Sequence, residues 1–307
     1  MLTDRIVFTN DTYISWDQAT VHQMSHGFGR GSAIFEIMGL HSIESDSVIF
    51  RLDKHIQRLY RTADLLEMEI PFTPEQLAER VKETVRRNQV ESGFIKIIGA
   101  YTDVAFSILP PDAPLSISIF VVDPEHDLGG LSFPFDTGTT VGISSWRKLD
   151  PQTVPVEAKA AANYLNGMVA RNEARRRGFE NVVLLDTQGF VAEGPTESIF
   201  FVKDGTLWTP APGTVLKSIT RSSIISAARF YDVDVKEARI PRRWLLTADE
   251  LFLAGTPNKV LPVRQIENRT IDTVPGPVTR NISKIMGDII NGRDENFRKW
   301  LFPVVSG

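Results

Sequence analysis

A lysine among alanines, followed by a tyrosine and later by a glutamate, is the part of this 307-residue sequence with the clearest chemical meaning. Lys159 has alanine at positions 158 and 160–162, so a flat ligand could pack closely against it. Burial in such surroundings lowers the pKa of a lysine from about 10.4 and frees the amine as a nucleophile. Tyr164 adds a phenol and Glu193 a carboxylate. Taken alone, each of these residues fits an ordinary surface position better than a catalytic one.

The elements around these residues can be predicted from the pattern of apolar residues. Residues 164–177 indicate a helix, and residues 182–186 form an apolar run typical of a buried strand. A turn is expected at 187–189 and a returning strand at 190–192. Glu193 then stands at the end of that strand, where its carboxylate could face a protonated ring nitrogen.

Lysine, tyrosine and glutamate in this order supply what a pyridoxal phosphate enzyme needs. The amine forms the Schiff base, the phenol holds the 3-oxygen of the ring, and the carboxylate keeps the pyridinium charged so that it acts as an electron sink. The sequence therefore predicts pyridoxal 5'-phosphate as cofactor, with Lys159 as the catalytic residue.

Two segments are suited to a phosphate group. Ser218-Ile219-Thr220-Arg221 precedes a helix expected from Ser222 to Tyr231, and a helix N-terminus presents backbone N–H groups and a favourable dipole to an anion. Gly255-Thr256-Pro257 follows an expected strand and offers backbone N–H groups with a hydroxyl. Arg58 lies outside the apolar stripe of a helix that Asp53 is expected to cap, which by itself indicates only a solvated charge.

A wider set of residues resembles the class IV (fold-type IV) aminotransferases, and within them the branched-chain amino acid aminotransferases. The similarity extends from about Ser25 to the 280s and is carried by Ser144-Ser145-Trp146, Lys159, Asn163-Tyr164-Leu165, Glu173-Ala174, Glu193-Gly194 and Ile199-Phe200. The resemblance implies that Lys159 forms the Schiff base, that Tyr164 and Glu193 contact the cofactor ring, and that Arg58, in the His55–Leu59 run, holds its phosphate. Ile219, Thr220 and Thr256 complete the expected cofactor-binding set.

The expected substrate-binding residues are Arg30, Phe35, Lys96 and Trp146, and this set departs from the branched-chain pattern. Arg30 stands where that group usually has a tyrosine, Ile37 where it has a glycine, and Lys96 where it has an arginine. Lys217-Ser218 replaces Pro-Gly, and Ser198 replaces an asparagine. The resemblance implies transamination between an amino acid donor and a 2-oxo acid. The alternatives are a D-amino acid or (R)-amine transaminase and, ranked lower, an aminodeoxychorismate lyase-like enzyme or a non-catalytic cofactor-binding protein.

Composition excludes several other classes of function. The net charge of −4 gives no reason to expect nucleic acid or an anionic membrane as partner. The absence of cysteine excludes disulfides and thiolate metal sites, and His22 and His26 lie in a glycine-rich region unsuited to a helical zinc site, so no metal is expected. With no apolar run of about 20 residues and no apolar signal core, we expect a cytoplasmic enzyme with small-molecule substrates.

The length and the mixture of short strands and helices predict two domains of α+β and α/β type. We place a small α+β domain at residues 1–122, a linker at 123–136, where Pro124, Gly129-Gly130 and Pro134 break the pattern, and a large cofactor-binding domain at 137–307. The resemblance implies a fold-type IV architecture like that of D-amino acid aminotransferase, with the cofactor in the cleft between the domains, and a homodimer.

Overall fold

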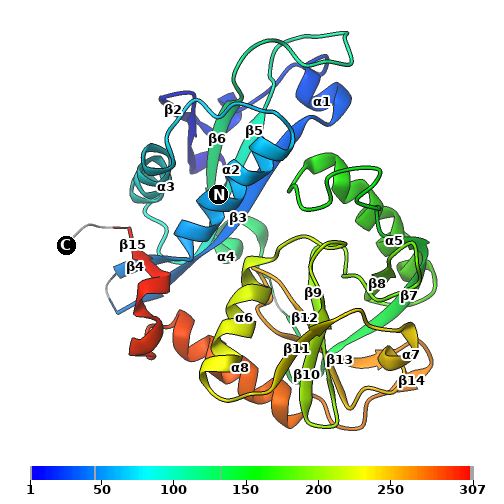
Figure 1. Ribbon diagram of the computed structural model, residues 1–307. Helices are drawn as coiled ribbons and strands as arrows, with labels where there is room; N and C mark the ends of the chain where they lie inside the picture. The colour runs from blue at the N-terminus through cyan, green and yellow to red at the C-terminus, as the bar shows by residue number, and fades with distance from the viewer. Residues whose placement is uncertain (1, 45, 132, 305–307) are drawn as a thin grey trace. The chain divides into compact units, whose positions relative to one another are not determined.

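The computed structural model describes residues 2–44, 46–131 and 133–304. They form two compact units (Figure 1). Unit 1 takes its described residues from 1–131, 158–162 and 289–307, and unit 2 from 132–157 and 163–288. The change from unit 1 to unit 2 between residues 131 and 132 falls inside the segment expected as a linker, which also contains the short helix α4 (Pro124–Leu128).

Unit 1 is built on a seven-stranded antiparallel sheet in the order β15-β4-β3-β5-β6-β1-β2. Its strands are β1 (Ile6–Thr9), β2 (Thr12–Ser15), β3 (Ala33–Ile43), β4 (Asp46–Phe50), β5 (Gly93–Ala100), β6 (Ser116–Val122) and β15 (Leu301–Pro303). Besides α4, its helices are α1 (His26–Arg30), α2 (Leu52–Leu65) and α3 (Pro74–Asn88), with short 3-10 turns at Leu2–Asp4, Trp16–Gln18 and Glu295–Trp300.

Alternation along the central strands of unit 1 separates a core face from an open face. Ile34 and Met38 of β3 and Ile95 and Ile97 of β5 are fully buried, whereas the residues between them, Glu36 excepted, are more exposed. The apolar stripes of α2 and α3 complete the same core, through Ile56, Leu59, Ala63, Leu77, Val81 and Val85.

Helices α2 and α3 of unit 1 begin differently from one another. The sequence Thr73-Pro74-Glu75-Gln76 predicts a capping box at the start of α3. The structure confirms it: Thr73 accepts from the backbone N–H of Gln76, whose side chain accepts from the Thr73 N–H. The prediction for α2 was wrong: Arg51, in the left-handed region with φ +55°, is its N-cap, and Asp53 lies in the first turn. There the carboxylate of Asp53 accepts from Arg51 Nε at 3.3 Å.

Unit 2 contains an eight-stranded mixed sheet in the order β11-β10-β9-β12-β13-β7-β8, with β14 paired to β13. The strands are β7 (Thr139–Arg147), β8 (Asn181–Leu185), β9 (Ser198–Lys203), β10 (Thr206–Pro210), β11 (Val235–Ala238), β12 (Glu250–Ala254), β13 (Leu261–Ile266) and β14 (Arg269–Thr270). The helices are α5 (Tyr164–Arg176), α6 (Ile219–Phe230) and α7 (Arg242–Leu245); a 3-10 turn at Ala161–Asn163 and helix α8 (Pro277–Ile290) contain residues of both units.

Most expected elements of unit 2 are present, with two differences. Residues 190–192 do not form a strand; they pair with β8 only through the bridge Leu185↔Val191 and the bond from Ala192 N to Leu184 O. Helix α6 begins at Ile219, three residues earlier than expected, because Ser218 caps it by accepting from Arg221 N at 3.2 Å.

Candidate active site

Lys159 belongs to a short segment that pairs with the edge of β3 in unit 1. Strand β4 pairs with β3 only from Leu40 onward, so the edge near Phe35 is open to another segment. Phe35 N donates to Lys159 O at 3.1 Å, and Lys159 N donates to Thr62 Oγ1 of α2 at 3.1 Å. These two bonds fix the backbone of Lys159. Its side chain is buried, with Nζ 4.6 Å from the centroid of the Phe35 ring.

The buried carboxylate of Glu36, on the core face of β3, contacts the side chains of His55 and Arg58 of α2. Glu36 Oε1 accepts from Arg58 Nε at 2.6 Å, and Glu36 Oε2 accepts from Arg58 Nη2 at 2.7 Å and lies 2.8 Å from His55 Nδ1. Burial alone would raise the pKa of Glu36, but the charge and hydrogen bonds of Arg58 and the hydrogen bond of His55 outweigh it and lower the pKa to about 2. Burial lowers the pKa of His55, and the charges of Arg58 and Lys159 add to this.

This cluster fixes the position and charge of Arg58. A bidentate carboxylate contact holds the guanidinium plane, and the ion pair keeps both partners charged. Sequence reasoning identified Arg58 but missed Glu36 and His55. The sequence does hold a signal for this cluster. Glu36 is an acidic residue at a strand position whose alternate neighbours are apolar, and His55 and Arg58 are three residues apart on one helix face.

Two further candidates lie on the open face of the unit 1 sheet. Phe35 pairs in register with Ile98, and Ile37 pairs with Lys96, so Phe35 and Lys96 share one face. Lys96 Nζ lies 5.5 Å from the centroid of the Phe35 ring. The ring is therefore within reach of two ammonium groups, those of Lys96 and Lys159.

Arg30 is the last residue of α1 and is exposed. Its Nη2 donates to the carbonyl oxygen of Phe106 at 3.0 Å, which ties α1 to the loop between β5 and β6. The glycines at 27, 29 and 31 predict a loop over residues 25–31. The structure instead has a one-turn helix there, capped by Ser25, whose hydroxyl oxygen accepts from Phe28 N.

Glu193 is the central charged residue among the candidates in unit 2. The backbone bond from Leu184 N to Glu193 O, at 2.9 Å, holds it beside β8. Its carboxylate is buried, with Oε1 2.8 Å from Lys148 Nζ and 3.3 Å from the N–H of Leu216. Sequence reasoning missed Lys148, because it follows β7 and its pairing with Glu193 depends on the sheet.

The other candidates of unit 2 stand at the ends of elements. Tyr164 is the first residue of α5 and is half-buried, whereas Trp146 near the end of β7 is exposed. Ile219 and Thr220 form the first turn of α6, where backbone N–H groups have no partner within the helix. Thr256 follows β12, and its carbonyl oxygen accepts from Lys259 Nζ at 2.7 Å.

The described part of the chain offers no other chemistry of comparable kind. Within residues 2–44, 46–131 and 133–304, no group of three or more His, Asp or Glu side chains could hold a metal ion. Among the same residues, no helix is both long and apolar enough to cross a membrane.

The comparison with known proteins decides the family. Residues 33–266, about three quarters of the chain, match the family "Amino-transferase class IV". The chain belongs to this family. It is 32% identical over 302 residues to a branched-chain-amino-acid aminotransferase of Salmonella typhimurium, which covers 98% of this chain and 97% of that protein. A probable branched-chain-amino-acid aminotransferase of Aquifex aeolicus is 33% identical, covering 94% and 93%.

Solved structures of class IV aminotransferases have the same fold. The branched-chain amino acid aminotransferase of Escherichia coli superposes with a TM-score of 0.92 at 30% identity, covering 99% of this chain and all of that one. The enzyme of Thermobaculum terrenum, solved in its pyridoxal phosphate form, gives 0.90 at 29% identity and covers both chains completely. The predicted fold-type IV architecture is therefore confirmed, and the chain is a pyridoxal phosphate-dependent aminotransferase. A D-amino acid or (R)-amine transaminase is not favoured.

Proposed function

We propose that this class IV aminotransferase transfers the amino group of branched-chain L-amino acids to a 2-oxo acid. The observation that carries the proposal is the buried Lys159, whose backbone is fixed on both sides and whose amine lies over an aromatic ring. Branched-chain donors are supported by the names of the relatives at about 30% identity over nearly the whole chain.

The residues of the chain fit pyridoxal phosphate. Lys159 would supply the amine for covalent attachment, and Arg58 a guanidinium for the phosphate. Glu193 would supply a carboxylate for the ring nitrogen and Tyr164 a phenol for the ring oxygen. The first turn of α6, at Ile219 and Thr220, and the hydroxyl of Thr256 supply further donors for the phosphate.

The proposed chemistry gives Lys159 two proton transfers. When bound, pyridoxal phosphate would supply an electron sink for the electrons left on the substrate α-carbon. The freed amine of Lys159 would remove the substrate α-proton as a general base and then give it back as a general acid. The carboxylate of Glu193 would favour a protonated ring nitrogen, which lowers the energy of the transition state electrostatically.

The substrate side is assigned to Arg30, Phe35, Lys96 and Trp146. Phe35 and Lys96 share one sheet face, so the ring offers an apolar surface and the ammonium a positive charge. The Arg30 guanidinium uses one N–H for Phe106, and a guanidinium has five in total. Arg30 is therefore still able to bind a carboxylate, which every α-amino acid donor carries.

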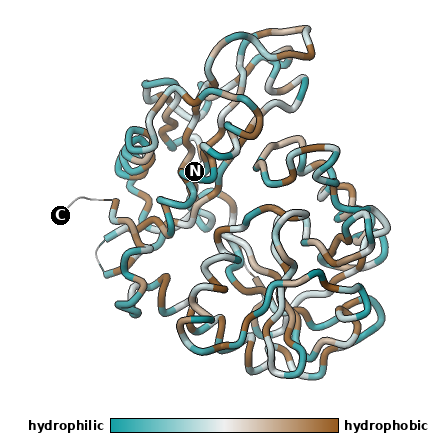
Figure 2. The backbone as a smooth tube through the Cα atoms, viewed as in Figure 1, coloured by the Kyte–Doolittle hydropathy of each residue, from teal (hydrophilic) through white to brown (hydrophobic). Residues whose placement is uncertain are grey.

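We also propose that two copies assemble into a homodimer. The loop between β5 and β6 exposes four large apolar residues, Val104, Phe106, Ile108 and Leu109, and Phe28 of α1 is exposed as well. Phe106 is 78% exposed, and the tip of this loop is brown in Figure 2. The loop is held to α1 by Arg30 and by the contact of His26 Nε2 with the carbonyl oxygen of Ile108, 3.2 Å apart. An exposed apolar surface on a loop fixed by such contacts is typical of a protein–protein interface.

Donor specificity and assembly can be tested separately. Steady-state rates with 2-oxoglutarate are compared for the L- and D-forms of leucine, alanine and glutamate and for 1-phenylethylamine. L-leucine should have the highest kcat/KM; a higher value for D-alanine or for the amine would overturn the donor assignment.

Sedimentation should give twice the mass of the chain, and Phe106→Ser with Ile108→Ser should give a monomer. A wild-type monomer would overturn the assembly.

A further inference from the structure

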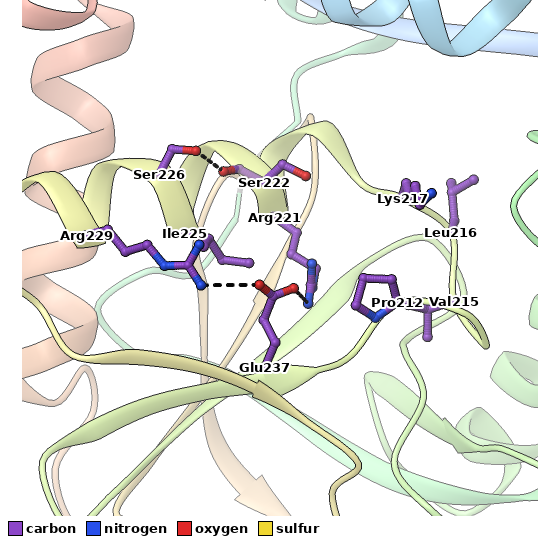
Figure 3. Close-up of a pocket in the computed structure, with 10 residues that line it drawn as sticks. All are labelled: Pro212, Val215, Leu216, Lys217, Arg221, Ser222, Ile225, Ser226, Arg229 and Glu237. Carbon is purple, nitrogen blue, oxygen red and sulfur yellow. Dashed lines mark hydrogen bonds and ion pairs between the residues drawn. The ribbon is translucent and has the colours of Figure 1, made fainter. Parts of the chain in front are cut away.

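A groove in unit 2 lies between the exposed flank of α6, the loop before it and β11 (Figure 3). It encloses about 260 Å³. Part of its polar lining comes from the exposed α6 residues Ser222, Ser226 and Arg229, and the rest from Arg221, from Lys217 of the loop and from Glu237 of β11. The proposed phosphate donors, Ile219 and Thr220, are not part of the lining. The groove is therefore distinct from the phosphate-binding turn.

The charges in the groove do not balance. Arg221 Nη2 lies 2.8 Å from Glu237 Oε2, and Arg229 Nη2 lies 3.3 Å from Glu237 Oε1, so two guanidinium groups share one carboxylate (Figure 3). Lys217 also lines the groove and pairs with Glu157 at 3.2 Å, which cancels its charge. The two arginines and Glu237 therefore carry one uncompensated positive charge. One of these arginines, Arg221, is almost fully buried.

The donors that remain for a ligand are cationic. The hydroxyls of Ser222 and Ser226 donate to the carbonyl oxygens of Ser218 and Ser222, each at 2.9 Å. Arg221 donates to Thr209 Oγ1, to the carbonyl oxygen of Pro210 and to Glu237. Arg229 is 59% exposed at its side chain, and its contact with Glu237 uses one of five N–H donors.

The groove also has an apolar lining. Pro212, Val215 and Leu216 of the loop and Ile225 of α6 contribute to it, and Val215 and Ile225 are buried. A surplus of one positive charge beside an apolar lining matches a monocarboxylate with a short aliphatic body better than a phosphate dianion, which would bring two charges.

We propose that this groove is a second binding site, for a small aliphatic monocarboxylate. The same loop reaches the proposed cofactor site, because the backbone N–H of Leu216 donates to Glu193 Oε1 at 3.3 Å. An occupied groove holds this loop in place and so steadies one contact of Glu193. That link rests on the proposed function, whereas binding in the groove does not.

The test measures binding of isovalerate to the cofactor-loaded protein by isothermal titration calorimetry. Wild type should bind isovalerate in the groove, and in Arg229→Gln the affinity of this binding event should fall by about tenfold through loss of a charge-assisted contact. Ser226→Leu, which fills the groove with an apolar side chain, should lose the event altogether. Arg242→Gln, which removes an exposed arginine on α7, is the matched control and should bind like wild type.

Two results would overturn the proposal. The first is an Arg229→Gln variant that binds as many isovalerate molecules as wild type, with unchanged affinity. The second is isovaleramide, the neutral analogue, binding the groove as well as isovalerate does, which would leave the surplus charge without a role. Both results are independent of transamination, so they are distinguishable from a failure of the proposed donor specificity.

Discussion

Lys148 Nζ lies 2.8 Å from Glu193 Oε1, and both side chains are almost buried, with 13% and 9% of their side-chain surfaces exposed. The carboxylate proposed to hold a protonated ring nitrogen thus already has a cation beside it. Two charges so far from water stabilise each other, and removal of one partner leaves the other uncompensated. The ion pair is therefore coupled to cofactor binding in a way that can be measured.

Replacing Lys148 by Met should destabilise the cofactor-free protein by about 3 kcal/mol, the usual cost of leaving a buried charge without its partner. Pyridoxal phosphate would then bring a replacement cation, so its addition should stabilise Lys148→Met more than wild type. Chemical denaturation with and without cofactor measures both differences. Lys148→Arg, which keeps the charge, is the control. Equal stabilisation of wild type and Lys148→Met by the cofactor would show that Glu193 does not face the ring nitrogen.

Lys159→Ala should abolish transamination and covalent cofactor attachment together, because the proposed imine and proton transfer both use its amine. Borohydride reduction followed by mass measurement of the chain detects the attachment. Lys96→Ala is a matched control, since it removes the other ammonium group near Phe35 and should leave the attachment intact. A borohydride-stable adduct on Lys159→Ala would refute the assignment.

Much of the local structure follows from local patterns in the sequence. Two apolar runs, at residues 199–203 and 207–209, flank Asp204-Gly205 and so predict the hairpin of β9 and β10. Asp-Gly suits a turn with two positive φ values, and the structure has φ +51° and +75° there. The capping box at Thr73 is equally local. The start of α2 was missed because Arg51 adopts a left-handed conformation without a glycine or asparagine to signal it.

The local pattern of apolar residues does not predict which distant segments of the chain pair with each other. The segment of Lys159 joins unit 1 because the edge of β3 is open beside Phe35, and strand β15, near the C-terminus, pairs with β4. Neither contact leaves a periodic signal, since each depends on segments about 120 or 250 residues apart. The same applies to Lys148, whose partner Glu193 was identified by type and position alone.

The buried cluster of Glu36 predicts how stability depends on pH. Because its folded pKa is about 2, below the ordinary value of 4.5, the unfolded chain binds the proton first as pH falls. The stabilising contribution of Glu36 should therefore be complete above about pH 5. Between about pH 5 and pH 2 the free energy of unfolding should fall by on the order of 3 kcal/mol. The lowered pKa of His55 acts in the same direction below pH 6.5.

Glu36→Gln isolates this contribution. The variant should be less stable than wild type at pH 7, because Arg58 loses its carboxylate, and the difference should shrink as pH falls from 5 to 3. Urea denaturation over this pH range measures both slopes. Glu83→Gln, at a partly exposed ion-paired carboxylate of α3, serves as control and should change the slope far less. A constant difference between wild type and Glu36→Gln would show that Glu36 keeps its ordinary pKa.

The final prediction concerns the substrate carboxylate. A transaminase must bind the α-carboxylate of its donor while the α-amine stays available for reaction, so a cation is needed in the substrate pocket. Arg30 stands where the branched-chain pattern has a tyrosine, and its guanidinium is exposed and held to the loop between β5 and β6 through Phe106. A guanidinium can bind a carboxylate through two parallel N–H bonds, whereas Lys96 offers only a point charge.

Arg30→Ala should therefore raise the KM for L-leucine by about tenfold or more, the cost of one charge-assisted contact, and change the KM for 1-phenylethylamine much less. Arg30→Lys should restore part of the loss, because the charge returns without the paired geometry. Loss of the bond to Phe106 could also loosen the loop and weaken every donor equally, so the ratio of the two KM values is the decisive quantity. An unchanged ratio would assign Arg30 to holding the loop and leave the carboxylate to another cation.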